Sequence, residues 1–454
     1  MRKDTPELQS AGRVVPSTKP DDHESVSQAW TVTFMLFLVA TISILDRNII
    51  TLLIDPIKHD FGLSDTQIGF LVGAAFALPF GAFVIPIGWA VDRMQRRSII
   101  AAGVAVWSSA TVATGLAGTF ATLVAARSLI GASDASIGPA TASWMGDLFP
   151  AQRLGLPMAV TNLGYKFGQG VALLAGGALA MWFVPGASYE VPLIGSIKGW
   201  QVIFIVVGLP GLAFAPLVLM MHEPTREPMG KDATNEAGFR TFLAYIRANR
   251  AFFIPHHLGF FALVAMTAVI LTWSPAFFVR AHGWSESMAG SKLGLAILIG
   301  PLLGLPLHGA LADYLYRKGW LDIHLRYPLI AMVAGAPILL FVFLVGQPDL
   351  AVFLLGVFWF VVSAYTSLPL TALVGVTPPR LRGKAISVVG LVSGTSGLVC
   401  GPLLVGTFSD AVFGDPEMVG YSIICSIACL LPLFVVCFAL ALRPLRAMAA
   451  LAKR

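Results

Sequence analysis

Apolar runs of about twenty residues recur along the whole 454-residue chain, and they constrain its fold more than any other feature. A helix of this length matches the ~30 Å hydrocarbon core of a bilayer. Only 12% of the residues are charged, about half the share of an average soluble domain. Backbone polar groups inside a bilayer must be satisfied within the segment, so the chain is predicted to be an all-α membrane protein.

Twelve of these runs are long enough to span a bilayer. A polar tail (1–29) precedes them, a loop (222–250) divides six spans from six, and a short tail (444–454) follows. No short apolar stretch with a small-residue cleavage site comes before the first run, so we expect that span to be retained. The predicted spans are residues 30–55, 64–92, 98–118, 120–148, 152–184, 200–221, 251–281, 286–315, 326–346, 349–377, 381–409 and 418–443.

The connections between spans indicate the orientation. Most of the 30 Lys and Arg residues fall on the side that holds both tails, and the positive-inside rule makes that side cytoplasmic. We expect a plasma-membrane protein (inner membrane in a bacterium) with both termini in the cytoplasm. Arg280, at the outer end of the seventh span, is interpreted as interfacial. Residues 237–248 in the central loop have an amphipathic pattern, but a plain connector is the favoured interpretation.

Several classes of function lack a sequence signal. No basic run interleaved with aromatic residues suggests nucleic-acid binding, and the spacing of the four cysteines fits no metal site. A phosphate-binding Gly-x-x-x-x-Gly-Lys-Ser/Thr loop is missing, which argues against an ATP-driven pump. We therefore expect no enzymatic activity, no cofactor and no metal.

A repeated motif divides the spans into two halves. Gly, Asp and a basic pair recur at the same offsets in residues 88–97 and 309–318. Parallel six-span halves are a known transporter plan, in which the solute binds at the interface between them. The repeat predicts two pseudo-symmetric six-helix bundles, residues 30–221 and 251–443.

The first copy of this motif resembles the loop signature of the major facilitator superfamily, Gly-x-x-x-Asp-Arg-x-Gly-Arg-Arg, although Gln95 stands at the usual second glycine. Residues 44–48, 62–71 and 126–136 together resemble the Spinster family, whose eukaryotic members export or salvage sphingolipids and lysolipids. The resemblance implies the major facilitator fold, with twelve transmembrane helices in two bundles.

Two details of the resemblance affect the choice of substrate. Asp134 stands where the Spinster family usually has Glu, which keeps the charge and loses about one methylene of reach. Organic-anion symporters share the adjacent Asp46 and Arg47 of the first span. A small organic-anion:proton symporter is therefore the alternative function.

Five charged residues stand out inside the predicted spans, where a charge costs at least about 2.5–3.5 kcal/mol. At 1.5 Å rise per residue, four of them fall in one layer roughly 20–24 Å from the cytoplasmic edge, and the fifth, Asp134, lies two turns nearer to that edge. Arg127 and Asp134 are seven residues apart and share one helix face. The five residues are Asp46, Arg47, Arg127, Asp134 and Lys166.

Asp46, Asp134 and Arg127 are predicted to couple transport to protons, because transporters use such intramembrane carboxylates as proton relays. Adjacent Asp46 and Arg47 point about 100° apart and are not each other's partners. The competing interpretation is a static ion pair between Asp46 and Arg127 that only locks two helices together.

The predicted substrate site joins a charged half to a neutral, aromatic-rich half, which suits a solute with a polar head and an apolar body. Asn162, Lys166 and Gln169 form a polar stripe on the fifth span. The predicted substrate-binding residues are Arg47, Arg127, Asn162, Lys166, Gln169, Trp273, Tyr365 and Ser393.

The loop signature is expected to hold the cytoplasmic side shut. Asp92 is placed to accept from the N–H groups that open the eleventh span, and Arg96 to reach Asp147. The predicted gating residues are Gly88, Asp92, Arg93, Arg96, Arg97, Asp147, Asp313 and Arg317.

Together these features predict a proton-coupled secondary transporter of a lysolipid-like or sphingoid-phosphate-like substrate, working by alternating access. We expect a monomer whose partners are membrane lipids, protons and one amphipathic small molecule. A membrane sensor or channel without coupled transport is the alternative from another class.

Overall fold

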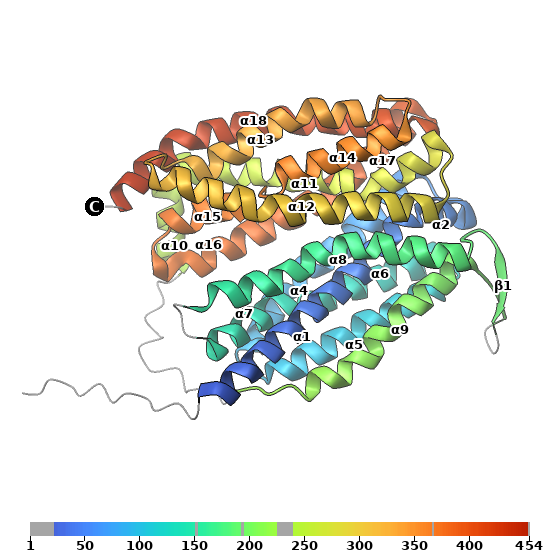
Figure 1. The fold of residues 1–454 in the computed structure, drawn as a ribbon, viewed down its shortest axis with the longest axis horizontal. Coiled ribbons are helices and arrows are strands. Elements are labelled where there is room, and N and C mark those ends of the chain that lie inside the picture. Colours follow the sequence, from blue (N-terminus) through green and yellow to red (C-terminus); the bar gives the residue numbers. More distant parts are fainter. Residues whose placement is uncertain (1–21, 150–152, 192–194, 225–238, 366, 453–454) are drawn as a thin grey trace, which may run out of the picture.

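The computed structural model describes residues 22–149, 153–191, 195–224, 239–365 and 367–452. Nearly all of these residues are helical, as the sequence predicts. Figure 1 shows two groups of long helices side by side, one from each half of the chain. We call residues 22–224 the N-bundle and residues 239–452 the C-bundle.

The N-bundle contains nine α-helices, the short 3-10 and π-helical segments η1 (Ile49–Leu52) and η2 (Phe70–Ala74), and one hairpin in its described residues. The hairpin strands β1 and β2 pair antiparallel. The elements are α1 (Asp22–Asn48), α2 (Ile54–Phe61), α3 (Asp65–Gly69), α4 (Ala75–Val91), α5 (Arg96–Gly115), α6 (Phe120–Asp134), α7 (Ile137–Leu148), α8 (Gly155–Trp182), β1 (Ser188–Val191), β2 (Gly195–Lys198) and α9 (Gly199–Leu219).

The C-bundle repeats this plan with longer helices. Short π-helical segments join several of its pieces into continuous rods. Its elements are α10 (Phe239–Ala248), α11 (Arg250–His282), α12 (Glu286–Arg317), α13 (Ile323–Val342), α14 (Pro348–Val362), α15 (Ser367–Val376), α16 (Arg382–Val388), η6 (Val389–Thr395), α17 (Ser396–Thr407), η7 (Phe408–Phe413) and α18 (Val419–Ala452).

Ten helices among the described residues are long and apolar enough to cross a membrane, which indicates a multi-pass membrane protein. They correspond to ten of the twelve predicted spans. The other two, 120–148 and 152–184, are also helical. The first is divided into α6 and α7 by a break at Ala135 and Ser136, and the second forms α8.

The interpretation of residues 237–248 as a plain connector was wrong, because residues 239–248 form the helix α10. Phe242 is buried, and the Tyr245 hydroxyl donates to the carbonyl of Val376 at 2.6 Å. The Tyr245 ring also meets the edge of Phe253. The apolar face of α10 therefore packs on the C-bundle.

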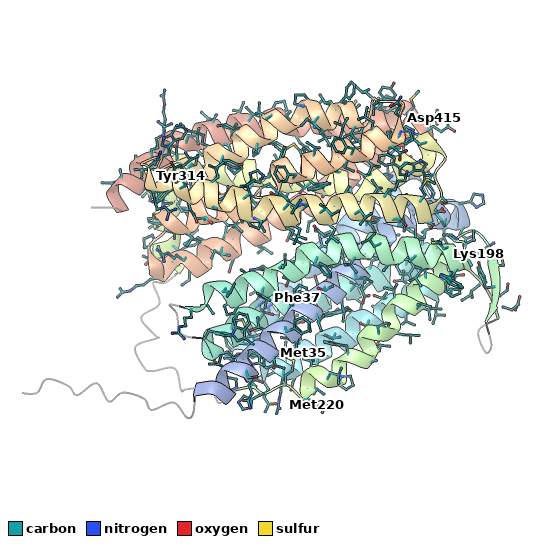
Figure 2. All side chains as sticks on the ribbon, in the orientation of Figure 1. Met35, Phe37, Lys198, Met220, Tyr314 and Asp415 are labelled. Atoms are coloured by element: carbon teal, nitrogen blue, oxygen red, sulfur yellow. The ribbon has the colours of Figure 1, made fainter. Side chains whose placement is uncertain are left out.

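The molecule has two distinct ends. The start of α1 and the end of α18 lie at one end, and β1 and α2 lie at the other. Figure 2 shows Tyr314 at the first end and Lys198 and Asp415 at the second. We call them the terminal end and the hairpin end.

Glycines bring the two bundles into backbone contact toward the hairpin end. A Cβ added at Gly177 of α8 would lie 3.0 Å from the Cα of Gly290 in α12, and one at Gly69 would lie 2.5 Å from the carbonyl oxygen of Pro402. At Gly88 and Gly309, which belong to the two loop motifs, an added Cβ meets nothing within 4 Å. The bundles are thus tightly joined at the hairpin end, while the loop motifs are not part of such a contact.

Candidate substrate and proton site

Asp46 lies inside the N-bundle. Its side chain is fully buried and accepts a hydrogen bond from Ser108 of α5 at 3.4 Å. The other carboxylate oxygen has no hydrogen-bond partner among the described residues. Arg47, the next residue, points elsewhere and places its guanidinium 4.1 Å from the ring centre of Phe76 in α4. The predicted divergence of these two side chains is confirmed.

Asp134 is the last residue of α6 and is held by α1. The Ser43 hydroxyl donates to its carboxylate. Ser43 and Arg47 are four residues apart and so share one face of α1. Arg47 acts on Asp134 through its positive charge, without a direct ion pair. An anion that binds Arg47 therefore changes the electrostatic environment of the Asp134 carboxylate.

Arg127 is the most deeply buried cation of the site, with 1% of its surface exposed. Its Nη1 donates to the backbone carbonyl of Arg47 at 3.2 Å, and its Nε has no partner among the described residues. Its guanidinium lies 5.9 Å from the Phe76 ring that Arg47 also faces. The static ion pair between Asp46 and Arg127 is not formed, because each binds other groups.

Lys166 of α8 connects the two bundles at this site. Its ammonium group donates to the Tyr365 hydroxyl, which belongs to the C-bundle, at 3.2 Å. It also lies 4.7 Å from the ring centre of Tyr365. Asn162 is exposed and Gln169 is half-buried on the same helix. Two of the predicted substrate residues, one from each half, are thus in direct contact.

The two other residues predicted in the second half are buried. Trp273 has no exposed surface, and its indole N–H donates to the carbonyl of Pro402 at 3.1 Å. Ser393 is 1% exposed, and its hydroxyl has no partner among the described residues. In this conformation Trp273 packs α11 against α17, and Ser393 offers an unused donor within η6.

The predicted contact between Arg96 and Asp147 is present. Arg96 binds the Asp147 carboxylate through Nη2 and donates to Ser143 through Nε at 2.8 Å. All three residues belong to the N-bundle, so this contact joins α5 to α7 within one bundle. The carboxylate of Glu223 caps α5 by accepting from the backbone N–H groups of Arg96 and Arg97.

The remaining gating residues lie near the terminal end. Arg93 stacks on Trp89 at 3.9 Å, and Asp92 is the C-cap residue of α4. In the C-bundle, Asp313 lies 4.0 Å from His324, and Arg317 ends α12. Among the described residues no cluster of three or more His, Cys, Asp or Glu side chains is placed to hold a metal ion.

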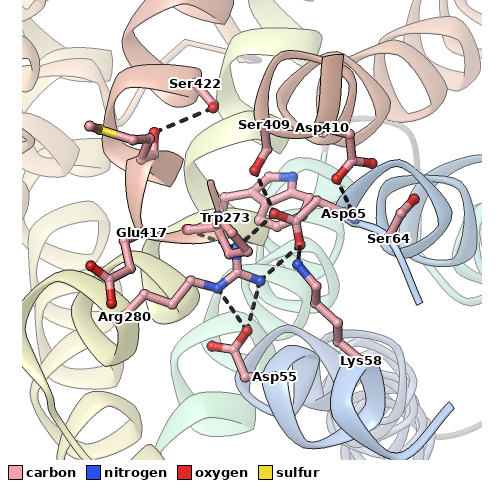
Figure 3. A network of polar contacts seen from close by, with 12 residues as sticks. Asp55, Lys58, Ser64, Asp65, Trp273, Arg280, Ser409, Asp410, Glu417 and Ser422 are labelled. Atoms are coloured by element: carbon pink, nitrogen blue, oxygen red, sulfur yellow. Dashed lines mark hydrogen bonds and ion pairs between the residues drawn. The ribbon is translucent and has the colours of Figure 1, made fainter. Parts of the chain in front are cut away.

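A second polar cluster, at the hairpin end, was not foreseen from the sequence. Figure 3 shows Arg280 of α11 between Asp55 and Asp65. Its Nε donates to Asp55 at 2.7 Å, and its two terminal nitrogens donate to Asp65 at 2.8 and 2.9 Å. We call the cluster the hairpin-end network, and it consists of Asp55, Lys58, Asp65, Arg280, Ser409 and Asp410.

The side chain of Arg280 is only 7% exposed, because it lies between the two bundles at the outer end of α11. A sequence signal did exist. Arg280 is one of the few basic residues on the side opposite the tails, and two acidic residues, Asp55 and Asp65, flank the first connection on that side.

Residues 36–372 match the sequence model of the Major Facilitator Superfamily. An MFS-type efflux pump of Mycolicibacterium smegmatis is 26% identical over 95% of this chain and 97% of its own length. A probable galactarate/D-glucarate transporter of Bacillus subtilis is 27% identical over 73% and 72%. Protein spinster of Drosophila melanogaster is 23% identical over 85% of this chain and 62% of its own length.

Solved structures show the same fold. A bacterial homologue of the human lysosomal transporter Spinster, in an inward-facing and unoccupied conformation, superposes with a TM-score of 0.75 at 24% identity, covering 94% of this chain and 97% of that one. A D-xylose-proton symporter gives a TM-score of 0.66 at 17% identity, covering 89% and 97%. The predicted resemblance to the Spinster family is confirmed.

Proposed function

Because the chain belongs to the Major Facilitator Superfamily, we propose that it is a proton-coupled secondary transporter of an organic anion with an apolar body. The observation that carries this proposal is the pair of arginines in the N-bundle. Arg47 and Arg127 both face Phe76, and among the described residues no carboxylate lies within ion-pair distance of either.

Two cations at bilayer depth require a counter-charge, because each is costly to bury alone. Guanidinium groups bind carboxylates and phosphates with two parallel hydrogen bonds. The Nε of Arg127 is free for such a bond. A substrate carboxylate or phosphate bound here supplies the direct ionic partner that the two arginines lack.

Proton coupling follows from the position of Asp134. The negative charge of Asp134 and that of a bound anion both interact with the positive charge of Arg47, and the two anions repel each other. A proton on Asp134 removes that repulsion, so proton and anion each favour the binding of the other. This linkage supports symport, with Asp46 as a second buried carboxylate in the same bundle.

The C-bundle supports an amphipathic substrate such as a lysolipid or sphingoid phosphate. It has almost no charged residue in the middle of its spans, and it offers Tyr365 and Ser393 as neutral polar groups. A second candidate is a small sugar acid, which is favoured by the relative named a probable galactarate/D-glucarate transporter. For that substrate Lys166 would bind a second polar group.

We place the protein in the plasma membrane as a monomer, with the terminal end in the cytoplasm. The excess of Lys and Arg on that side supports this orientation. Since the bundles are joined at the hairpin end, the conformation described here then faces the cytoplasm.

Transport into proteoliposomes under an imposed pH gradient tests the proposal. A lysophospholipid and galactarate, both anionic, are offered separately and in competition. Saturable uptake that rises with the gradient supports the proposal, and preference for an acyl chain selects the amphipathic class. Binding without flux would indicate a sensor, and flux without saturation a channel, and either result would overturn it.

A further inference from the structure

Asp65 has more partners than any other carboxylate of the hairpin-end network. Its side chain is fully buried. It accepts from Lys58 at 2.6 Å, from two nitrogens of Arg280 and from the Ser409 hydroxyl at 2.6 Å. Two cations therefore share one carboxylate.

These two cations belong to different bundles. Lys58 lies on α2, which is fixed to the N-bundle because the Trp200 indole in α9 donates to Asp60 at 2.7 Å. Arg280 is fixed to the C-bundle, since it donates to the Pro416 carbonyl at 3.2 Å and faces the Trp273 ring. Lys58 and Asp65 thus move together, and Arg280 moves with the other bundle.

The C-bundle also holds the backbone beside Asp65. The Asp410 carboxylate accepts from the N–H groups of Asp65 and Thr66 at 3.0 and 2.7 Å. The carbonyl of Asp65 lies so close to Gly406 that a Cβ there would approach it to 2.3 Å. The contact between bundles at this point is both ionic and backbone-to-backbone.

Separation of the bundles at this end removes Arg280 from Asp65 and Asp55. A buried carboxylate left without a cation is strongly unfavourable. Lys58 remains on Asp65, however, so that charge stays paired. On the other side Arg280 and Asp410 leave together with opposite charges. The network can therefore divide without leaving an isolated charge at its centre.

We propose that Asp65 is the centre of a reversible ionic contact between the bundles, which we call the clasp. Arg280 joins the two bundles by binding Asp65, and Lys58 keeps Asp65 paired when Arg280 leaves. The inference rests on alternating access, which belongs to the proposed function. It gives the two cations opposite roles. Loss of Arg280 favours opening of the hairpin end, and loss of Lys58 opposes it.

Distances between spin labels at the hairpin end test these roles without any substrate. Labels at Leu116, which follows α5, and Gln347, which precedes α14, report on the N-bundle and C-bundle, and both positions are exposed. The protein is studied in lipid nanodiscs with its four native cysteines replaced. A Ser409→Ala background weakens the clasp enough that both populations are measurable.

We expect Arg280→Gln and Asp65→Asn to increase the long-distance population relative to the short one by roughly tenfold. Lys58→Gln should reduce it several-fold. The matched control is Lys292→Gln, since Lys292 pairs with the exposed Asp349 at the same end but within the C-bundle. This control should leave the distribution unchanged.

A shift of Lys58→Gln in the same direction as Arg280→Gln would overturn the proposal, as would an unchanged distribution in Asp65→Asn. If Asp65→Asn fails to fold, Arg280→Lys, which keeps the charge and loses the double contact, should give an intermediate shift. Failure of the transport assay with intact distance shifts would reject the proposed function and leave the clasp in place.

Discussion

The two bundles share one plan but differ in the chemistry of their interiors. The N-bundle buries Asp46, Arg127 and Asp134. The C-bundle has almost no charged residue in the middle of its spans and offers hydroxyl side chains there instead. His256 is fully buried and binds the carbonyl of Pro369 at 3.0 Å.

The unsatisfied atoms follow the same division. In the middle of the N-bundle they include atoms of charged groups, Asp46 and Arg127, whereas in the C-bundle they belong to neutral side chains such as Ser393 and Trp359. Atoms of charged groups without partners are costly, so they indicate a missing ligand or proton. The difference suggests that the N-bundle binds charge and the C-bundle shapes the rest of the site.

The largest expected effect comes from removing the buried cation. Arg127→Gln should reduce transport by at least about a hundredfold, because truncating one partner of a buried charge pair costs several kcal/mol. Uptake and calorimetric binding measure the loss. Lys292→Gln, an exposed cation outside the site, should transport like the wild type. Normal transport by Arg127→Gln would contradict the conclusion that the N-bundle binds the charged part of the substrate.

Asp134→Asn should abolish the response to a pH gradient while substrate exchange without a gradient continues. The variant imitates the protonated carboxylate, which favours anion binding but cannot release a proton. Counterflow and gradient-driven uptake distinguish the two activities. Ser43→Ala, which removes only the hydroxyl that donates to Asp134, should retain coupling. A full gradient response in Asp134→Asn would show that coupling lies elsewhere.

A smaller effect is expected where the bundles meet. Lys166→Met should raise KM roughly tenfold with a smaller change in kcat, since a hydrogen bond to a charged group contributes about 1.5–3 kcal/mol. Tyr365→Phe keeps the ring and removes the hydroxyl that Lys166 contacts, so its effect should be weaker. Equal effects of the two variants would mean that their mutual contact, rather than contact with substrate, is what matters.

The smallest effect is expected in the C-bundle. His256→Gln can still donate to the carbonyl of Pro369, and transport should stay within about twofold of the wild type at every pH tested. Uptake measured across a pH series checks this. A changed pH profile would assign proton coupling to both bundles and break the comparison between them.

Much of the N-bundle site could be predicted from local rules. Helical periodicity predicted that Asp46 and Arg47 diverge, as their separate contacts show. The contact of Arg96 with Asp147 was also foreseen. These predictions succeeded because they depend on geometry within one helix or between neighbouring helices.

The hairpin-end network depends on contacts across the bundles, which no local pattern specifies. Arg280 and Asp65 are 215 residues apart in the chain. Residues 239–248 were misjudged for a similar reason, because α10 is stabilised by Phe242 and Tyr245 packing on the C-bundle rather than by helix propensity. In both cases the structure depends on a contact with residues that are distant in the sequence.

The glycine contact between α8 and α12 has a mechanical consequence. Because Gly177 and Gly290 meet through their backbones, no side chain lies between the two helices at this point. With 28 residues, α8 is roughly 42 Å long. Gly177 lies 22 residues from the start of α8 at Gly155, which is roughly 33 Å. A tilt of about 10° around this pivot therefore moves that end of the helix, at the opposite face of the membrane, by about 6 Å.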